Sequence, residues 1–194
     1  MKLEIGGQRN IQGWTNLGQR DNNFNVITQD LSYEDNSIEE IYWSHVIEHI
    51  APAYIKGVIT KFYNKLKPGG KFRTVCPDLR AIVEAYINND LDAFNRDTHR
   101  NHWSSYKGIY QELGIGGAFV AQICNTSTHE GDENILISGD KQYMYGTVSH
   151  VGGYDFDILE KLLKMVGFSK VERTGLESLD PHQQGGQLCV NAYK

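Results

Sequence analysis

Two histidines and a glutamate stand close together in the segment SHVIEHI, residues 44–50. The pattern H-x-x-E-H, here His45, Glu48 and His49, is the ligand spacing of one class of zinc peptidases. On a helix, residues four apart lie on one face, so the two histidines would bind one ion with the glutamate beside them. The spacing alone therefore permits a zinc-dependent hydrolase.

The surrounding sequence argues against this zinc site. Catalytic zinc needs a third protein ligand, usually from a following helix, and Glu84 is the only glutamate between residues 64 and 86. His45 also directly follows an apolar, strand-compatible stretch at 38–44, whereas the peptidase motif needs both histidines inside one helix. We therefore expect no bound metal and keep the zinc-dependent hydrolase only as an alternative.

The composition is that of a globular protein. The chain has 194 residues, of which 40% are hydrophobic and 22% charged, enough for one domain with a substantial core. A net charge of −5 without a run of Lys or Arg does not favour a nucleic-acid partner. Three widely spaced cysteines, Cys76, Cys124 and Cys189, indicate a reducing compartment. With no apolar leader and no membrane-length apolar run, we expect a cytoplasmic protein without a membrane partner.

The apolar pattern predicts strands that alternate with helices. Helical spacing, with apolar residues three and four apart, runs from Tyr54 to Leu66, after Pro52 and before the glycine pair at 69–70. Strands are expected at 2–5, 14–17, 38–44, 71–76, 168–174 and 187–193, and further helices at 79–86 and 156–166. This alternation predicts a mainly parallel sheet that is covered on both faces.

Short motifs occur in the order and with the gaps of a known family. The chain contains LEIGGQ, GWTNLG, QDL, DNSIEEIYWSHVIEHI, LKPGGKFRTVCPDL and, later, HVGGYDFDILEKLLKMVGFSKVERT. In these motifs it resembles the type 11 family of class I S-adenosylmethionine-dependent methyltransferases. The resemblance implies an α/β fold with a Rossmann-like seven-stranded sheet, mostly parallel with an antiparallel last strand, in one domain of residues 1–194. The short gap from residue 7 to 14 predicts a short or missing first helix.

The resemblance also implies S-adenosyl-L-methionine as the cofactor and S-adenosyl-L-homocysteine as the product. Gly6 and Gly7 would let the main chain approach the amino-acid part of the cofactor, and the carboxylate of Asp30 would accept a hydrogen bond from the adenine amino group. Ser44 and His45 follow a central strand, at the edge where open α/β sheets bind ligands. The predicted cofactor-binding residues are Glu4, Gly6, Gly7, Gln8, Gly18, Asp30, Leu31, Ser44 and His45.

Two positions depart from the family's pattern. The second strand usually ends in an acidic residue that holds the ribose, where this chain has Gly18, and the third residue of the first loop is Gln8 instead of glycine. Either Gln19 or a main-chain amide holds the ribose, or the affinity is lower by about 1.5–3 kcal/mol, tenfold or more. Glu4, at the first strand, would compensate in part. The departures keep open an inactive relative that binds S-adenosylmethionine or a nucleotide.

Methyl transfer to oxygen or nitrogen requires that the acceptor be positioned and that a proton be removed. Histidine titrates near neutrality, and we predict His45 and His150 as catalytic residues and His49 as a structural one. Residues 88–150 lack clear periodicity, which is typical of a functional insertion or lid. We expect this insertion to fold over the cofactor and to form the acceptor pocket through Tyr106, Tyr110, Tyr143 and Tyr145. The acceptor is expected to be a small molecule, and sugar-related acceptors are implied by the resemblance alone.

Overall fold

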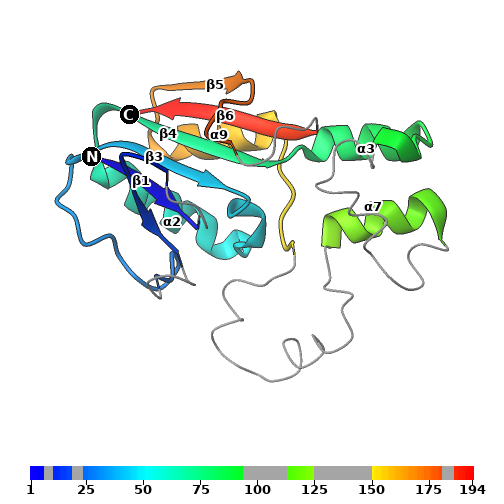
Figure 1. The fold of residues 1–194 in the computed structure, drawn as a ribbon, viewed down its shortest axis with the longest axis horizontal. Coiled ribbons are helices and arrows are strands. Elements are labelled where there is room, and N and C mark those ends of the chain that lie inside the picture. Colours follow the sequence, from blue (N-terminus) through cyan, green and yellow to red (C-terminus); the bar gives the residue numbers. More distant parts are fainter. Residues whose placement is uncertain (7–10, 19–23, 94–112, 125–149, 181–185) are drawn as a thin grey trace.

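One six-stranded sheet organises the molecule. The computed structural model of the chain describes residues 1–6, 11–18, 24–93, 113–124, 150–180 and 186–194. The strands are β1 (Lys2–Ile5), β2 (Trp14–Leu17), β3 (Ile38–Ser44), β4 (Leu66–Pro77), β5 (Lys170–Thr174) and β6 (Gln187–Tyr193), in the order β2-β1-β3-β4-β6-β5 (Figure 1). Strands β1 to β4 pair in parallel, and β6 lies antiparallel between β4 and β5. The predicted Rossmann-like sheet, mostly parallel with an antiparallel last strand, is confirmed.

The described part of the sheet differs from the expected one in strand number. Residues 24–37, between β2 and β3, form turns and irregular backbone instead of a further strand, so a seventh strand is not confirmed. The described residues between β1 and β2 contain no helix, which agrees with the expected short or missing first helix.

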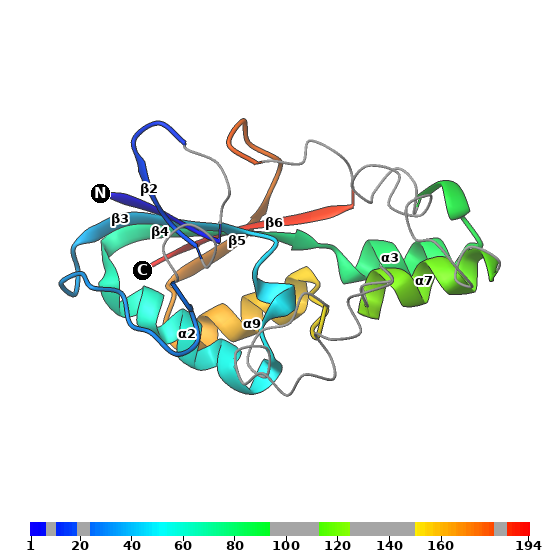
Figure 2. The same ribbon diagram turned by 60° about the horizontal axis from the view of Figure 1, so that its bottom comes forward.

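Two helices cover one face of the sheet. Helices α2 (Pro52–Lys65) and α9 (Phe156–Val166) lie side by side there (Figure 2). The buried residues of α2 follow the predicted helical period: Ile55, Val58, Ile59 and Phe62. The shorter elements are η1 (Ile47–His49), directly after β3, and α3 (Leu79–Ile87) and α7 (Gly114–Cys124), beyond the carboxyl end of β4. Among the described residues, no helix combines the length and the apolar composition needed to cross a bilayer.

In the described part of the chain, the second face of the sheet is covered without a helix. The second face carries a small cluster of Tyr42, Val75 and Cys189, against which Trp14 and Leu176 pack. These covering residues come from β2 and from the segment after β5. The short β1–β2 connection supplies no helix in its described residues, so side chains of strands and loops exclude water from this face instead.

The junction of α2 and β4 also differs from the prediction. The helix ends at Lys65, and β4 begins at once with Leu66 instead of at residue 71. Leu66 is fully buried and pairs with Ile38, so its packing favours an extended conformation over another helical residue. Gly69, with φ +76°, provides irregular backbone within β4, where the pairing with β3 shifts register.

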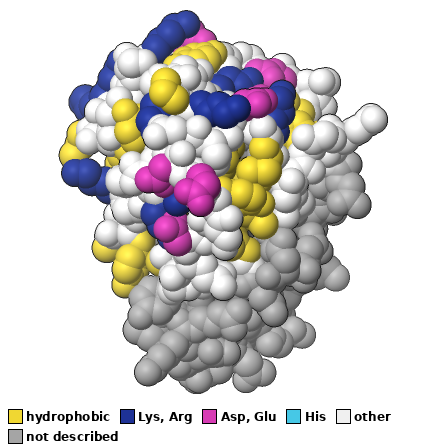
Figure 3. All heavy atoms as spheres, turned by 90° about the vertical axis from the view of Figure 1, so that its left-hand side faces the viewer, with side chains coloured by type: hydrophobic (Ala, Val, Ile, Leu, Met, Phe, Trp, Pro, Cys, Tyr) yellow, Lys and Arg dark blue, Asp and Glu magenta, His cyan; other side chains and the backbone are white. Residues whose placement is uncertain are grey.

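The amino end of the sheet is closed by surface ion pairs. Glu39 contacts the amino terminus at 3.1 Å and Lys67 at 3.2 Å, and Glu40 contacts Lys2 at 3.0 Å. Figure 3 shows acidic and basic side chains next to one another on this side of the molecule. Glu39 is exposed, so its pairs contribute little to stability, whereas Glu40 is buried.

A fully buried arginine joins the last three strands on the second face. Arg73 in β4 is 0% exposed and donates from Nη1 to Thr174 and Asn191, at 2.9 and 3.0 Å. Its Nε and Nη2 donate to the two carboxylate oxygens of Asp180, which is 2% exposed. Burial lowers the pKa of Arg73, but the hydrogen bond and charge of Asp180 and the charge of Glu177 outweigh burial and raise it. The guanidinium is therefore held as a paired charge.

We expect Asp180→Asn to lower the free energy of unfolding by about 3 kcal/mol, because it leaves the buried Arg73 charge without its main partner. Glu177→Gln is the matched control, since Glu177 contacts the same guanidinium at 3.1 Å but is 38% exposed. Its loss should cost about 1 kcal/mol or less. Urea unfolding measures both, and equal losses would contradict this account of Arg73.

Candidate functional site

The carboxyl ends of the parallel strands meet at one edge of the sheet. Ile5 of β1 pairs with Trp43 of β3, and Ser44 pairs with Val75 of β4, so these strands end close together. The loops that follow them therefore leave the sheet at a common edge, where open α/β sheets bind ligands. Most of the site residues predicted from the sequence follow these strand ends.

Gly6 closes the first strand in a conformation that requires glycine. Its φ is +76°, and its N–H donates to the carbonyl of Leu17 at 2.8 Å. A Cβ atom at this position would lie 2.6 Å from Cγ2 of Val46. The loop after β1 thus lies directly against the loop after β3, and the fold itself requires this glycine, whatever its contact with a ligand.

We expect Gly6→Ala to lower the free energy of unfolding by about 2 kcal/mol, from the positive φ together with the contact with Val46. Gly57→Ala is the control: Gly57 lies within α2, and nothing lies within 4 Å of an added Cβ there. That change should stabilise the protein by about 0.5–1 kcal/mol. Urea unfolding distinguishes the two, and a neutral Gly6→Ala would contradict the strain argument.

The other predicted residues of the first two strands have structural contacts. Glu4 is buried in β1, where its Oε2 accepts a hydrogen bond from Asn16 Nδ2 at 3.3 Å. Gly18 is buried just after β2, and its carbonyl accepts from the N–H of Phe24 at 3.3 Å. The predicted Gly7 and Gln8 lie outside the described residues.

The segment that carries Asp30 and Leu31 is fixed to α2 by one lysine. Lys61 Nζ donates to three carbonyl oxygens of this segment, at 2.8, 3.2 and 2.6 Å. Burial lowers the pKa of Lys61, and the charge of Asp30 opposes that shift. Asp30 itself is exposed and caps the N–H of Leu31 at 2.8 Å, whereas the Leu31 side chain is packed in the core. Of the two residues, Asp30 is the one exposed to a ligand.

Ser44 is the last residue of β3, at the carboxyl edge. Its Oγ is buried and has no hydrogen-bond partner among the described residues. Side chains two apart in a strand share a face, so Ser44 lies on the same face as Tyr42, away from α2 and α9. At the carboxyl edge, a buried hydroxyl without a partner can donate to or accept from a polar ligand.

A buried carboxylate lies at the centre of the histidines. Glu48, in η1, is 2% exposed, and its Oε1 lies 3.0 Å from His45 Nδ1. The other ring nitrogen of His45, Nε2, lies 2.9 Å from Oε1 of Gln187 in β6. His45 has φ +55°, which turns the chain out of β3. Both ring nitrogens of His45 therefore face side chains of the protein.

The segment after His150 is bonded to the main chain of Glu48. The carbonyl oxygen of Glu48 accepts hydrogen bonds from the N–H groups of Val151, at 2.8 Å, and Gly152, at 3.2 Å. The rings of His150 and His49 are edge to face, with centroids 5.0 Å apart. Glu48, His49 and His150 each offer a metal-binding atom, and these atoms all lie within 4.8 Å of one another.

The three histidines keep Glu48 ionised. Burial opposes ionisation of this carboxylate, but the hydrogen bond and charge of His45 and the charges of His49 and His150 outweigh burial and lower its pKa to about 2.

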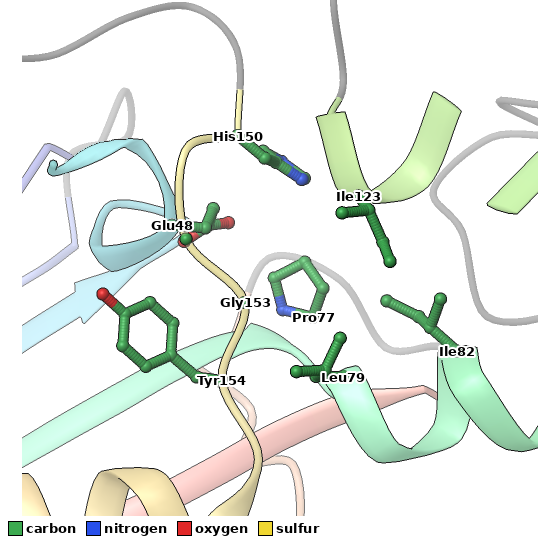
Figure 4. Close-up of a pocket in the computed structure, with 9 residues that line it drawn as sticks. Glu48, Pro77, Leu79, Ile82, Ile123, His150, Gly153 and Tyr154 are labelled. Carbon is green, nitrogen blue, oxygen red and sulfur yellow. The ribbon is translucent and has the colours of Figure 1, made fainter. Parts of the chain in front are cut away.

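A small pocket lies beside this cluster (Figure 4). Glu48 and His150 line one side of it, and Leu79 and Ile82 of α3 with Ile123 of α7 line the other. Its free volume is about 20 Å³, room for about one water molecule or ion. Tyr154 also lines it, and burial, with the charges of Cys76 and Glu48, raises the pKa of its phenol to about 12. The pocket is therefore mostly apolar, with a charged group on one side.

The structure brings together residues that the sequence analysis treated separately. Of the two histidines predicted as catalytic, His45 contacts Glu48, and His150 has a ring nitrogen within 4.8 Å of the Glu48 carboxylate. His49, expected to be structural, lies against His150. The central role of Glu48 was missed, because no local pattern shows that residue 150 returns to this loop. The four tyrosines predicted to form the acceptor pocket lie outside the described residues: Tyr106, Tyr110, Tyr143 and Tyr145.

No family model and no curated protein matches the chain. Among similar solved structures, an S-adenosylmethionine-dependent methyltransferase from Archaeoglobus fulgidus is 12% identical with a TM-score of 0.49, over 100% of this chain and 85% of that one. Another from Thermotoga maritima is 12% identical with a TM-score of 0.47, over 100% and 81%. An O-methyltransferase from Nostoc punctiforme is 12% identical with a TM-score of 0.45, over 93% of this chain but only 37% of that longer one. Likeness at this level leaves the function to be argued from the chain's own residues.

Proposed function

We propose that the chain is an S-adenosylmethionine-dependent methyltransferase that transfers a methyl group to oxygen or nitrogen of a small-molecule or saccharide acceptor. The observation that carries the proposal is the orphan Ser44 hydroxyl, buried at the sheet edge where the family motif SHVIEH ends its strand. Gly6 and the exposed Asp30, both at motif positions, add to it. These three residues offer a hydroxyl, a main-chain approach and a carboxylate, which fit a polar cofactor, although Gly18 offers no carboxylate for the ribose.

When bound, the cofactor supplies a methyl group already activated by its sulfonium. The protein's part is to hold the acceptor in line and to receive its proton. We assign the second task to His150, because it lines the pocket and has a ring nitrogen within 4.8 Å of the Glu48 carboxylate. His45, with both ring nitrogens facing Glu48 and Gln187, positions that carboxylate instead of accepting the proton.

Ser44→Ala separates a ligand contact from a structural one. If Ser44 binds the cofactor, we expect the affinity for S-adenosylhomocysteine to fall several-fold, with stability unchanged, since the hydroxyl has no hydrogen-bond partner among the described residues. Thr74→Val is the matched control, because Thr74 Oγ1 is another buried hydroxyl without such a partner but lies within β4. Calorimetry with S-adenosylmethionine and S-adenosylhomocysteine measures both variants. Wild-type protein that binds neither compound would overturn the proposed function.

Asp30→Ala tests the predicted adenine contact. Its removal should weaken S-adenosylhomocysteine binding about tenfold, the loss expected for one charge-assisted hydrogen bond. Asp35→Ala is the control, since Asp35 lies in the same connection between β2 and β3 but contacts Lys65 at 2.9 Å. Equal affinities in the two variants would remove Asp30 from the site while leaving the methyltransferase proposal standing.

A further inference from the structure

We propose that Glu48, His49 and His150 form a binding site for a divalent transition-metal cation, and that zinc is the cation the donor set fits. Two imidazoles and one carboxylate are the protein ligands of a common type of catalytic zinc, which keeps a fourth position open. The expectation of no bound metal concerned a different site, one in which His45 and His49 are the two histidine ligands. His150 supplies the third ligand that the neighbouring sequence lacks.

The distances fit such a site. The three ligand atoms lie within 4.8 Å of one another, and in a tetrahedral site with zinc–ligand bonds of about 2.1 Å they would be roughly 3.4 Å apart. The main-chain bonds from Val151 and Gly152 to the Glu48 carbonyl hold the His150 backbone against η1. To bind a cation, the two half-buried imidazole rings would have to bring their ligand atoms closer together than they lie here.

The buried carboxylate is the second, independent observation. Glu48 is 2% exposed, and its Oε2 has no hydrogen-bond donor among the described residues. Its Oε1 faces His45, so the carboxylate is oriented by an outer partner, as metal-binding carboxylates are. His45 in turn faces Gln187, which extends that orientation to the sheet.

The pocket beside the cluster provides the open position. Glu48 and His150 border its free volume of about 20 Å³, which accommodates one water molecule or the oxygen of a ligand on the cation. A cation here would lower the pKa of an acceptor hydroxyl bound to it. Binding the cation and accepting the acceptor's proton are therefore two alternative roles of His150. This role in acceptor activation rests on the proposed function, whereas the metal site itself does not.

Zinc binding to the purified, chelator-treated full chain tests the site directly. We expect one equivalent of zinc in equilibrium dialysis at micromolar concentration. Cobalt should give the visible absorption of a four- or five-coordinate ion. His49→Gln and His150→Gln should each weaken binding about a hundredfold or more, because each removes one of three ligands. Both residues are only half-buried, so the variants are expected to fold.

His45→Gln is the matched control, since His45 contacts the same carboxylate without being a ligand. It should weaken zinc binding about tenfold and keep the one-to-one stoichiometry. No zinc bound to the wild type, or binding unchanged in both ligand variants, would overturn the site. Calorimetry with S-adenosylhomocysteine on the same samples keeps the two proposals apart. Wild-type protein that binds S-adenosylhomocysteine but no zinc rejects only the metal site, and wild-type protein that binds zinc but neither S-adenosylmethionine nor S-adenosylhomocysteine rejects only the methyltransferase.

Discussion

The carboxyl edge of the sheet is organised around one buried carboxylate. A charge as deeply buried as that of Glu48 would cost several kcal/mol without partners. Its side chain takes a partner from His45, at the end of β3, and its carbonyl accepts from the segment just after His150. One residue thereby fixes the loop after β3 and the segment that leads into α9, although these lie far apart in the sequence.

The antiparallel last strand is part of this arrangement. Because β6 runs against β4, its first residue, Gln187, pairs with Pro77 and so arrives at the carboxyl edge beside His45. A parallel β6 would bring Tyr193 there instead. The end of β4 is secured in the same way: Asp78 caps α3 through the N–H of Arg80 and accepts a hydrogen bond from Arg173 at 2.6 Å. The contacts of Gln187 and Asp78 at this edge therefore depend on β4, β5 and β6, the strands on the side of the sheet away from β1 and β2.

Local patterns in the sequence predicted most of the elements. The helical period of α2 and α9 reflects burial of one helix face against the sheet. The apolar runs of β1, β3 and β6 reflect strands that are largely buried, and both kinds of pattern are visible in the sequence itself. The start of β4 at Leu66 was not predictable in this way, since it depends on pairing with Ile38 across the sheet. The same holds for Arg73, whose partners lie in β5, in β6 and after β5. The structural features that could not be predicted are those that depend on contacts between residues far apart in the sequence.

The H-x-x-E-H segment shows that a sequence spacing predicts a pair of metal ligands only if the backbone has the conformation that the spacing assumes. The peptidase interpretation requires His45 and His49 on one face of a helix. Here His45 has φ +55° and only Ile47–His49 form a single 3₁₀ turn, so the two histidines do not share a helical face. Glu48 and His49 instead converge with His150, because the Glu48 carbonyl binds the backbone that follows it. The strand before His45 argued against this ligand pair at the level of sequence, but a local pattern of this kind could not identify the cluster with His150.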